Sequence, residues 1–271
     1  MSDNPIILSD NHNLSLVNNN LSQPSRIKQM ILSEVMGTIT TEPTTDWQDL
    51  EPYEDETTEK WGYKNKNTAE VIIKPKYDET WAFTEGLGAV KLNKKEGFID
   101  KNGVEVIPLK YNLVWDFNDG FAGVKLNDKW GFINKYGTNI TPIKYDEVCR
   151  FIGEFASVKL NNKCGFINKE GSEITPIKYD RVWGFSEGLA GVELNNKEGF
   201  VNKIGIEAIR LKYNWVGNFM DGLAMVSLKG EHSFINRNGA TVTLQYDESR
   251  TFVKEYERTL RNSRYCKIHK E

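Results

Sequence analysis

The residues of this chain that could do chemistry at a regular spacing are lysines that precede a tyrosine and then Asp or Asn. They occur as Lys76-Tyr77-Asp78, Lys110-Tyr111-Asn112, Lys144-Tyr145-Asp146, Lys178-Tyr179-Asp180 and Lys212-Tyr213-Asn214. An activated lysine can act as a nucleophile, but an active site does not need five copies of it. The column is therefore interpreted as a structural ladder, in which Asp or Asn holds a bend and the tyrosine ring packs between units.

Other catalytic groups are sparse. The three histidines are His12 and His269, which lie in the terminal segments, and His232. No metalloprotease, nucleophile-elbow or phosphate-loop motif is present in the sequence. Cys149 and Cys164 stand in columns that hold Trp elsewhere, so they are interpreted as packing residues. We therefore expect no enzymatic activity, no cofactor and no metal site.

A second column consists of Trp81, Trp115 and Trp183, each two residues before a phenylalanine. In an extended chain, residues two apart point to the same side, so the repeat Tyr, Trp and Phe are expected on one side. Two interpretations stay open. The column forms a core between units, or it forms an aromatic stripe that binds a protein or a sugar.

The stretch from Glu42 to Glu59 is strongly acidic, with eight carboxylates and no Lys or Arg. It is either a solvated loop or, with its two aromatic residues, a docking surface for a basic protein. The candidate partner-binding residues in it are Asp46, Trp47, Asp49, Glu51, Tyr53, Glu54, Asp55 and Glu56.

These candidates are positioned by a repeat. One glycine recurs at Gly62, Gly97, Gly131, Gly165 and Gly199, with Ser233 in the sixth place. Successive positions differ by 35 residues and then by 34 each time. A fixed period of this length is typical of stacked repeat architectures, in which neighbouring units share one core.

Each unit is predicted to be a three-stranded antiparallel meander. Residues after the recurring glycine form a strand, and a second glycine such as Gly137 closes a turn. The returning strand contains Pro142, so it should lie at an edge or carry a bulge. Alternating apolar residues in 156–160 indicate a half-buried strand, which Asn161-Asn162 joins to the next unit through a hairpin.

The predicted fold is all-β, with five to six meanders of about 34 residues in an open curved or superhelical array. The alternative is a closed propeller-like ring, although propeller blades usually have about 40 residues and four strands. The predicted segments are a flexible stretch 1–21, a helix with an acidic linker 22–59, the array 60–252, and a basic tail or cap 253–271. The helix is amphipathic and covers about residues 26–36.

Composition limits the partners. The net charge is −3 and the isoelectric point is about 5.8, which argues against non-specific binding of nucleic acid. No segment approaches the roughly 18 apolar residues of a membrane span. We expect a cytoplasmic protein that binds neither nucleic acid nor membrane.

The run KWGFINKYG, followed by ITPIKYDEV and the segment FSEGLAGV, resembles the bacterial WG-repeat (KWG repeat) family. Trp precedes the glycine only at Trp61 and Trp130. Elsewhere the position holds Glu96, Cys164, Glu198 and His232. We expect it to be partly exposed, and we add Glu96, Trp130 and Glu198 to the candidate partner-binding residues.

The resemblance implies an interaction scaffold, and such repeats include immunity proteins found beside secreted toxins. It carries no catalytic residues. The expected function is therefore a non-enzymatic protein-binding protein, in its most concrete form an immunity protein that neutralises a basic toxin. The alternative is recognition of a carbohydrate or another cell-envelope ligand by the aromatic stripe.

Overall fold

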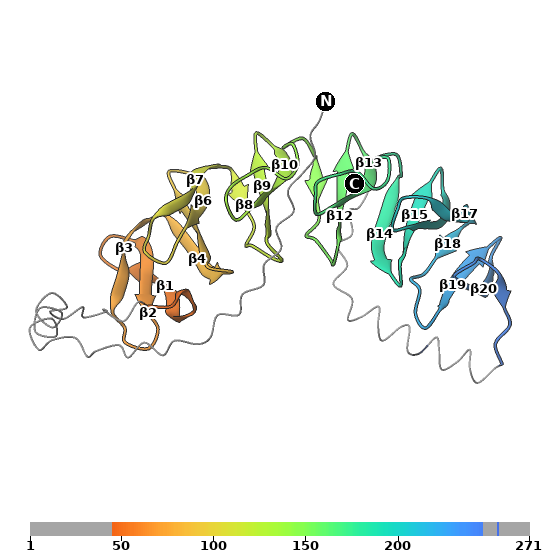
Figure 1. Cartoon of the computed structure of the whole chain (residues 1–271), viewed down its shortest axis with the longest axis horizontal. Coiled ribbons are helices and arrows are strands. Elements are labelled where there is room, and N and C mark those ends of the chain that lie inside the picture. The colour runs from red at the N-terminus through yellow and green to blue at the C-terminus, as the bar shows by residue number, and fades with distance from the viewer. Residues whose placement is uncertain (1–44, 246–253, 255–271) are drawn as a thin grey trace, which may run out of the picture. The chain divides into compact units, whose positions relative to one another are not determined.

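The computed structural model describes residues 45–245 and Lys254, and the account below concerns these residues (Figure 1). The predicted flexible segment 1–21, the helix near residues 26–36 and the tail 253–271 lie outside the described residues, apart from Lys254.

The described chain forms six antiparallel sheets that follow one another in sequence order (Figure 1). After a short 3-10 helix, η1 (Trp47–Asp49), the first sheet contains β1 (Leu50–Asp55), β2 (Lys60–Asn65) and β3 (Val71–Tyr77). The second contains β4 (Glu79–Thr84), β5 (Leu87–Leu92), β6 (Lys95–Ile99) and β7 (Glu105–Tyr111). The third contains β8 (Leu113–Val114), β9 (Phe121–Leu126) and β10 (Lys129–Asn134).

The second half repeats this arrangement. The fourth sheet contains β11 (Glu147–Val148), β12 (Phe155–Leu160) and β13 (Lys163–Asn168). The fifth contains β14 (Arg181–Ser186), β15 (Leu189–Leu194), β16 (Lys197–Asn202) and β17 (Glu207–Tyr213). The sixth contains β18 (Trp215–Val216), β19 (Leu223–Leu228), β20 (Glu231–Asn236) and β21 (Thr241–Val242). Within residues 45–245 no strand pairing joins the first sheet to the last, so the predicted open array is confirmed and the closed ring is not observed.

The central hairpin of each sheet follows from the sequence. Between β12 and β13, Asn161 and Asn162 have φ of 51° and 60°. Positive φ at both positions is the geometry of a type I′ turn, which matches the twist of the flanking strands. The hairpin predicted at this site is confirmed.

The edge strands explain the recurring glycine. β7 pairs with β6 with shifts in register, and it contains Pro108 at the edge of its sheet. A Cβ atom on Gly97 would lie 2.5 Å from the carbonyl oxygen of Ile107. Only glycine lets the bulged edge strand approach this closely. The predicted edge position and bulge are both confirmed.

The prediction of three strands per unit is wrong for the second, fifth and sixth sheets, which have four. The strand missed is the first one, for example β4, which carries the tryptophan column. In the third and fourth sheets the last strand is replaced by isolated bridges such as Trp130 to Tyr145. There a buried threonine stands where other units have isoleucine. The backbone N–H of Phe132 donates to the hydroxyl of Thr141 at 3.0 Å, in place of regular strand pairing.

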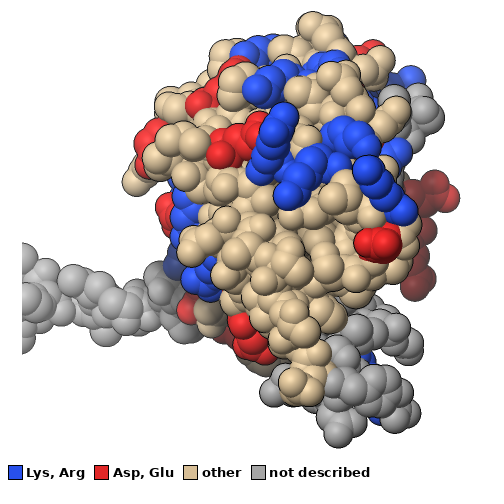
Figure 2. Space-filling view, turned by 90° about the vertical axis from the view of Figure 1, so that its right-hand side faces the viewer, with Lys and Arg blue, Asp and Glu red and all other residues tan. Residues whose placement is uncertain are grey.

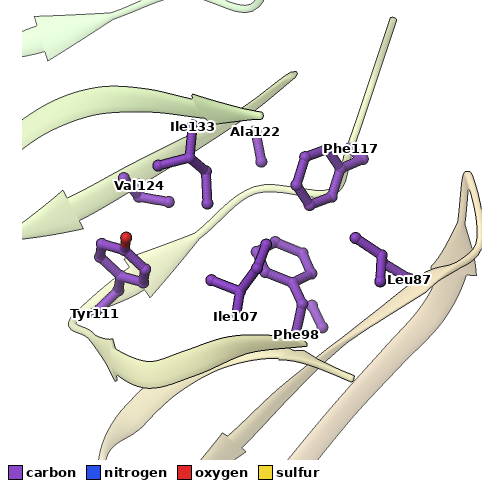
Figure 3. Packing of buried hydrophobic residues seen from close by; sticks show 9 residues of the cluster. Leu87, Phe98, Ile107, Tyr111, Phe117, Ala122, Val124 and Ile133 are labelled. Carbon is purple, nitrogen blue, oxygen red and sulfur yellow. The ribbon is translucent and has the colours of Figure 1, made fainter. Parts of the chain in front are cut away.

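The core is divided among successive pairs of sheets. Figure 3 shows Phe98, Ile107 and Tyr111 of the second sheet facing Val124 and Ile133 of the third. All five side chains are fully buried. Each sheet therefore completes its core only with a neighbour, as expected for a repeat.

The acidic segment is not a linker as far as the structure describes it. β1 pairs with β2 from Leu50 to Asp55, and Leu50 is buried in the hydrophobic cluster formed with Tyr63 and Ile73 of the same sheet. The array thus begins at Leu50 and not at Lys60. This strand was not predicted, because its carboxylates interrupt the alternation of apolar residues seen in the other units.

Candidate binding surface

The lysine-tyrosine column is structural, as predicted. All five tyrosine rings are buried, and each preceding lysine places its Nζ atom 5.0 to 5.2 Å from the ring centre. Asp146 accepts a hydrogen bond from the N–H of Asn161 at 2.7 Å and pairs with Lys129. The Lys129 ammonium holds the pKa of Asp146 below its usual range. The carboxylate therefore fixes a bend, and each repeated lysine lies over the ring of the tyrosine that follows it.

The position before the recurring glycine is more buried than predicted. Cys164 is buried, and Glu96 and Glu198 expose only 5% and 7% of their surface. The expected partial exposure is wrong for these residues, and it holds for the half-buried Trp61 and Trp130 and the exposed His232.

The reason is that this position faces the next sheet. Glu96 accepts a hydrogen bond from the backbone N–H of Val114 at 2.7 Å, and Glu198 accepts one from Val216 at 2.6 Å. Burial raises the pKa of Glu198 to about 7, and burial also raises the pKa of Glu96. Both glutamates join adjacent sheets and expose little surface, although Glu96 lines a hollow between the second and third sheets.

The acidic candidates of the first sheet have local structural roles. Asp46 caps η1, where it accepts a hydrogen bond from the N–H of Gln48. Asp55 accepts hydrogen bonds from the N–H groups of Thr57 and Thr58 in the turn that follows β1.

Two further carboxylates in this sheet form ion pairs, since Glu51 lies 3.4 Å from Lys64 and Asp49 lies 4.0 Å from Lys66. Glu54 and Glu56 are exposed, Trp47 is half-buried, and the Tyr53 ring lies under the Lys64 ammonium. β1 is an edge strand, and its proline and carboxylates disfavour addition of another strand. It presents charge rather than backbone groups.

A hollow of about 350 Å³ lies between the second and third sheets. Its apolar lining includes Trp81, Leu113 and Trp115, and its polar lining consists of Glu96, Asp116 and Arg150. Trp81 is 36% exposed and Leu113 is 38% exposed. The structure thus brings together two of the three tryptophans that the sequence singled out.

Local geometry explains why these rings face outward. The pairing of β4 with β5 shifts register between Thr80 and Phe83. This bulge turns Trp81 outward while Phe83 stays buried. The expectation that Tyr77, Trp81 and Phe83 share one side is therefore wrong.

Trp115 is held by its neighbours. A Cβ atom on Gly123 would lie 2.5 Å from the Trp115 ring, so the ring lies directly on the glycine backbone. The Arg150 guanidinium lies 5.5 Å from the centre of the Trp115 ring. The centres of the Trp115 and Trp130 rings are 4.6 Å apart. Arg150 also donates to the carbonyl of Asp116 at 3.4 Å.

The third tryptophan, Trp183, lies on the backbone of Gly191 in the fifth sheet and does not line this hollow. The intervening fourth sheet has the buried Cys149 at the equivalent position. The predicted stripe is therefore interrupted. Leu113, Asp116 and Arg150 were missed, although Arg150 was visible as the single arginine of its repeat column.

Two further features bear on the class of site. Among the described residues, no group of three or more His, Cys, Asp or Glu side chains could hold a metal ion. The described part of the chain also contains no helix long and apolar enough to cross a lipid bilayer.

The sequence matches the family model described as WG containing repeat in five segments, residues 61–95, 97–130, 130–164, 165–197 and 199–231. The chain belongs to this family. The WG-repeat segments cover most of the described residues, and each match begins within one sheet and runs into the next.

Solved structures similar to this WG-repeat chain share little sequence with it. Hsv2 of Kluyveromyces lactis has 12% identity and a TM-score of 0.34, and 59% of each chain is covered. PorZ, a surface component of the type-IX secretion system of Porphyromonas gingivalis, has 8% identity and a TM-score of 0.32, with 69% of this chain and 30% of PorZ covered. The WG-repeat chain thus spans less than two thirds of each of these two solved structures. A search of curated protein sequences gave no significant match.

The WG-repeat array presents charge of both signs. Figure 2 looks onto the side that lies at the right of Figure 1, where β19 and β20 are seen. Lys and Arg side chains gather in the upper part of this view, whereas the first sheet carries the acidic strand β1. Different parts of the surface therefore suit partners of opposite charge.

Proposed function

We propose that this WG-repeat protein is a non-enzymatic protein-binding protein, and that the hollow formed by Trp81, Leu113, Trp115 and Arg150 is the centre of the contact. The observation that carries the proposal is the convergence of two indole rings, an exposed leucine and a stacked guanidinium in one concave surface. Trp and Arg are the residue types most enriched among binding hot spots.

The support of the hollow favours binding without large rearrangement. Trp115 rests on the backbone of Gly123, and its ring is flanked by Arg150 and Trp130. Glu96 ties the two sheets that form the walls, through its hydrogen bond to Val114. A preorganised surface loses less conformational entropy when a partner binds.

The concrete form of the proposal is a cytoplasmic immunity protein that sequesters a basic toxin. The acidic strand β1 belongs to the sheet that precedes the hollow, and Glu54 and Glu56 are exposed. Exposed carboxylates accelerate association with a basic protein through long-range attraction. This form rests on the family resemblance and on the charge of β1.

Co-expression with the product of the neighbouring gene, followed by affinity purification, tests the proposal. We expect a stable complex from the unmodified chain. Trp81→Ala and Arg150→Ala should each weaken binding at least about 30-fold, the effect of a hot-spot residue. Tyr136→Ala is the matched control, since Tyr136 is 86% exposed and does not line the hollow. Equal affinity in all four proteins would place the contact elsewhere.

The immunity form has its own test. Co-expression should restore growth of cells that produce the toxin, and Glu54→Gln with Glu56→Gln should slow association more at low salt than at high salt. A complex that forms without protecting the cells would support protein binding and exclude immunity.

A carbohydrate is the second candidate, because Trp81 and Trp115 line the same hollow as the polar groups of Asp116 and Arg150. Titration with bacterial cell-envelope oligosaccharides should then change the indole fluorescence, and Trp81→Ala should abolish the change. An unchanged spectrum at millimolar sugar would exclude this candidate.

A further inference from the structure

At three of the five junctions between successive described sheets, an ion pair joins a turn of one sheet to a turn of the next. The acid in the turn before the second strand of one sheet meets a basic residue in a turn of the next sheet. Three junctions have this pair, with Nζ or Nη to carboxylate distances of 3.1, 2.6 and 2.7 Å. The pairs are Glu85 with Lys135, Asp119 with Lys169, and Glu187 with Arg237. In each case the basic residue follows the acid by 50 residues.

The junction between the fourth and fifth sheets lacks this ion pair. The acid position is Gly153, and the glutamate follows as Glu154, so the usual order of acid and glycine is reversed. Glu154 turns back to Lys169 of its own sheet at 3.5 Å. Lys203, which is 50 residues after Gly153, makes no ion pair within residues 45–245.

A hollow of about 540 Å³ occupies this same junction. Ile152 lines it and is 48% exposed. The rings of Phe155 and Phe185 lie in the wall with their centres 4.4 Å apart. The apolar part of the hollow is thus built by two aromatic rings in tilted contact and an exposed isoleucine.

Charged groups surround this apolar part. Glu187 lines the hollow, but it is paired with Arg237 and accepts a hydrogen bond from the N–H of Gly222 at 3.0 Å. Glu154 also lines the hollow, and it shares Lys169, at 3.5 Å, with the closer Asp119. Lys203 also lines the hollow, and its stem passes 3.9 Å from the Cβ position of Gly188. Of the charged side chains that line the hollow, Lys203 is thus the one with no ion pair among the described residues.

We propose that the hollow between the fourth and fifth sheets binds a small carboxylic acid with an aromatic or branched apolar body. The apolar body packs on Phe155, Phe185 and Ile152, and the carboxylate takes the place of the missing turn acid beside Lys203. The volume lies in the range of small-molecule sites, which combine apolar walls with a few polar groups. Charge complementarity selects an acid over a neutral or basic ligand.

This site is separate from the hollow at Trp81 and Trp115, which lies two junctions earlier in the array. It does not depend on the proposed protein-binding function. Loss of one can therefore be measured while the other is kept.

The test is titration of the full chain with 3-phenylpropionate, followed by calorimetry and by the methyl NMR signal of Ile152. We expect saturable binding that shifts the Ile152 signal. The uncharged analogue 3-phenylpropanol should bind at least ten-fold more weakly. Lys203→Gln should weaken binding of the acid by a similar factor without changing binding of the alcohol.

The repeat itself offers a second variant. Gly153→Asp combined with Glu154→Gly gives this turn the same order as Asp119-Gly120. A Cβ atom at Gly153 meets nothing within 4 Å, and Asp119 adopts a φ of 55° close to the 61° of Gly153. The new aspartate should pair with Lys203 and reduce binding of the acid at least ten-fold.

Lys135→Gln is the matched control, because Lys135 already pairs with Glu85 and should not affect binding. Thermal melts establish that each variant is folded. Absence of saturable binding to the unmodified chain would overturn the proposal. Equal binding by Lys203→Gln, or an Ile152 signal that does not move, would overturn it as well.

Discussion

The carboxylate of Glu198 in β16 accepts a hydrogen bond of 2.6 Å from the backbone N–H of Val216, which lies 18 residues further on in β18 of the next sheet. Glu96 makes the equivalent contact with Val114. A position that two other units fill with the indole rings of Trp61 and Trp130 therefore carries a polar contact between sheets in these two units.

The first prediction concerns pH. Burial raises the pKa of Glu198 from the usual 4.5 to about 7. Between these two values the unfolded chain loses the proton while the folded chain keeps it, so stability falls as pH rises through this range. Glu198→Gln keeps an oxygen acceptor for Val216 and cannot ionise. We expect it to gain on the order of 2 kcal/mol over the unmodified chain between pH 4 and pH 8.

Urea unfolding at several pH values measures this difference. Glu231→Gln is the control, since Glu231 is exposed on strand β20 and does not contact Glu198. A stability difference between Glu198→Gln and the unmodified chain that does not change with pH would show that Glu198 is ionised in the folded protein.

The second prediction concerns the buried threonine of the third sheet. Thr141→Val preserves shape but removes the acceptor for the N–H of Phe132. An unpaired buried N–H costs about 1 to 3 kcal/mol. Thr138→Val, at an exposed position of the same segment, should change the free energy of unfolding by less than about 0.5 kcal/mol. Chemical denaturation compares the two variants, and equal effects would contradict the assigned hydrogen bond.

The third prediction compares two buried tyrosines. The hydroxyl of Tyr63 donates to the carbonyl of Trp81 at 2.8 Å, whereas the buried hydroxyl of Tyr111 has no partner among the described residues. Tyr63→Phe should cost about 1 kcal/mol, while Tyr111→Phe should be neutral or stabilising. Thermal melts of the two variants compare the losses of stability. A larger loss of stability in Tyr111→Phe than in Tyr63→Phe would contradict the prediction.

The fourth prediction concerns the packing of the Trp115 ring on the backbone of Gly123. Gly123→Ala places a methyl group about where the ring lies, since the ideal Cβ position is 2.5 Å from a Trp115 ring atom. Overpacking of this kind costs about 1 to 3 kcal/mol, and the displaced ring should weaken partner binding. Gly191→Ala meets Trp183 at 3.1 Å and should cost less. Unfolding free energies and indole fluorescence of the two variants test the difference.

The repeat, its turns and its edge strands were predictable because each depends on local chemistry. Paired asparagines determine a type I′ turn, and proline is confined to an edge or a bulge. The first strand of the second sheet, β4, was harder to predict, because a bulge between Thr80 and Phe83 interrupts the alternation that reveals a strand. Strand β1 was missed because its carboxylates conceal Leu50 and Tyr53.

The candidate site was predicted only in part. Trp81 and Trp115 were recognised from their column, but their meeting with Arg150 depends on contact between sheets, which a single unit does not encode. Glu96 and Glu198 were assigned to the surface because charged residues are seldom buried. Their burial depends on a backbone donor 18 residues away in the next sheet.

The hydrogen bonds of Glu96 and Glu198 and the ion pairs between turns all connect one sheet to the next sheet only. Because these contacts join only neighbouring sheets, the array is modular in evolution. A duplication or loss of 34 residues, the distance from Gly131 to Gly165, recreates the same junction chemistry on both sides of the change. The number of units can therefore vary by recombination between repeats, while substitutions at single junctions give each unit its own binding chemistry.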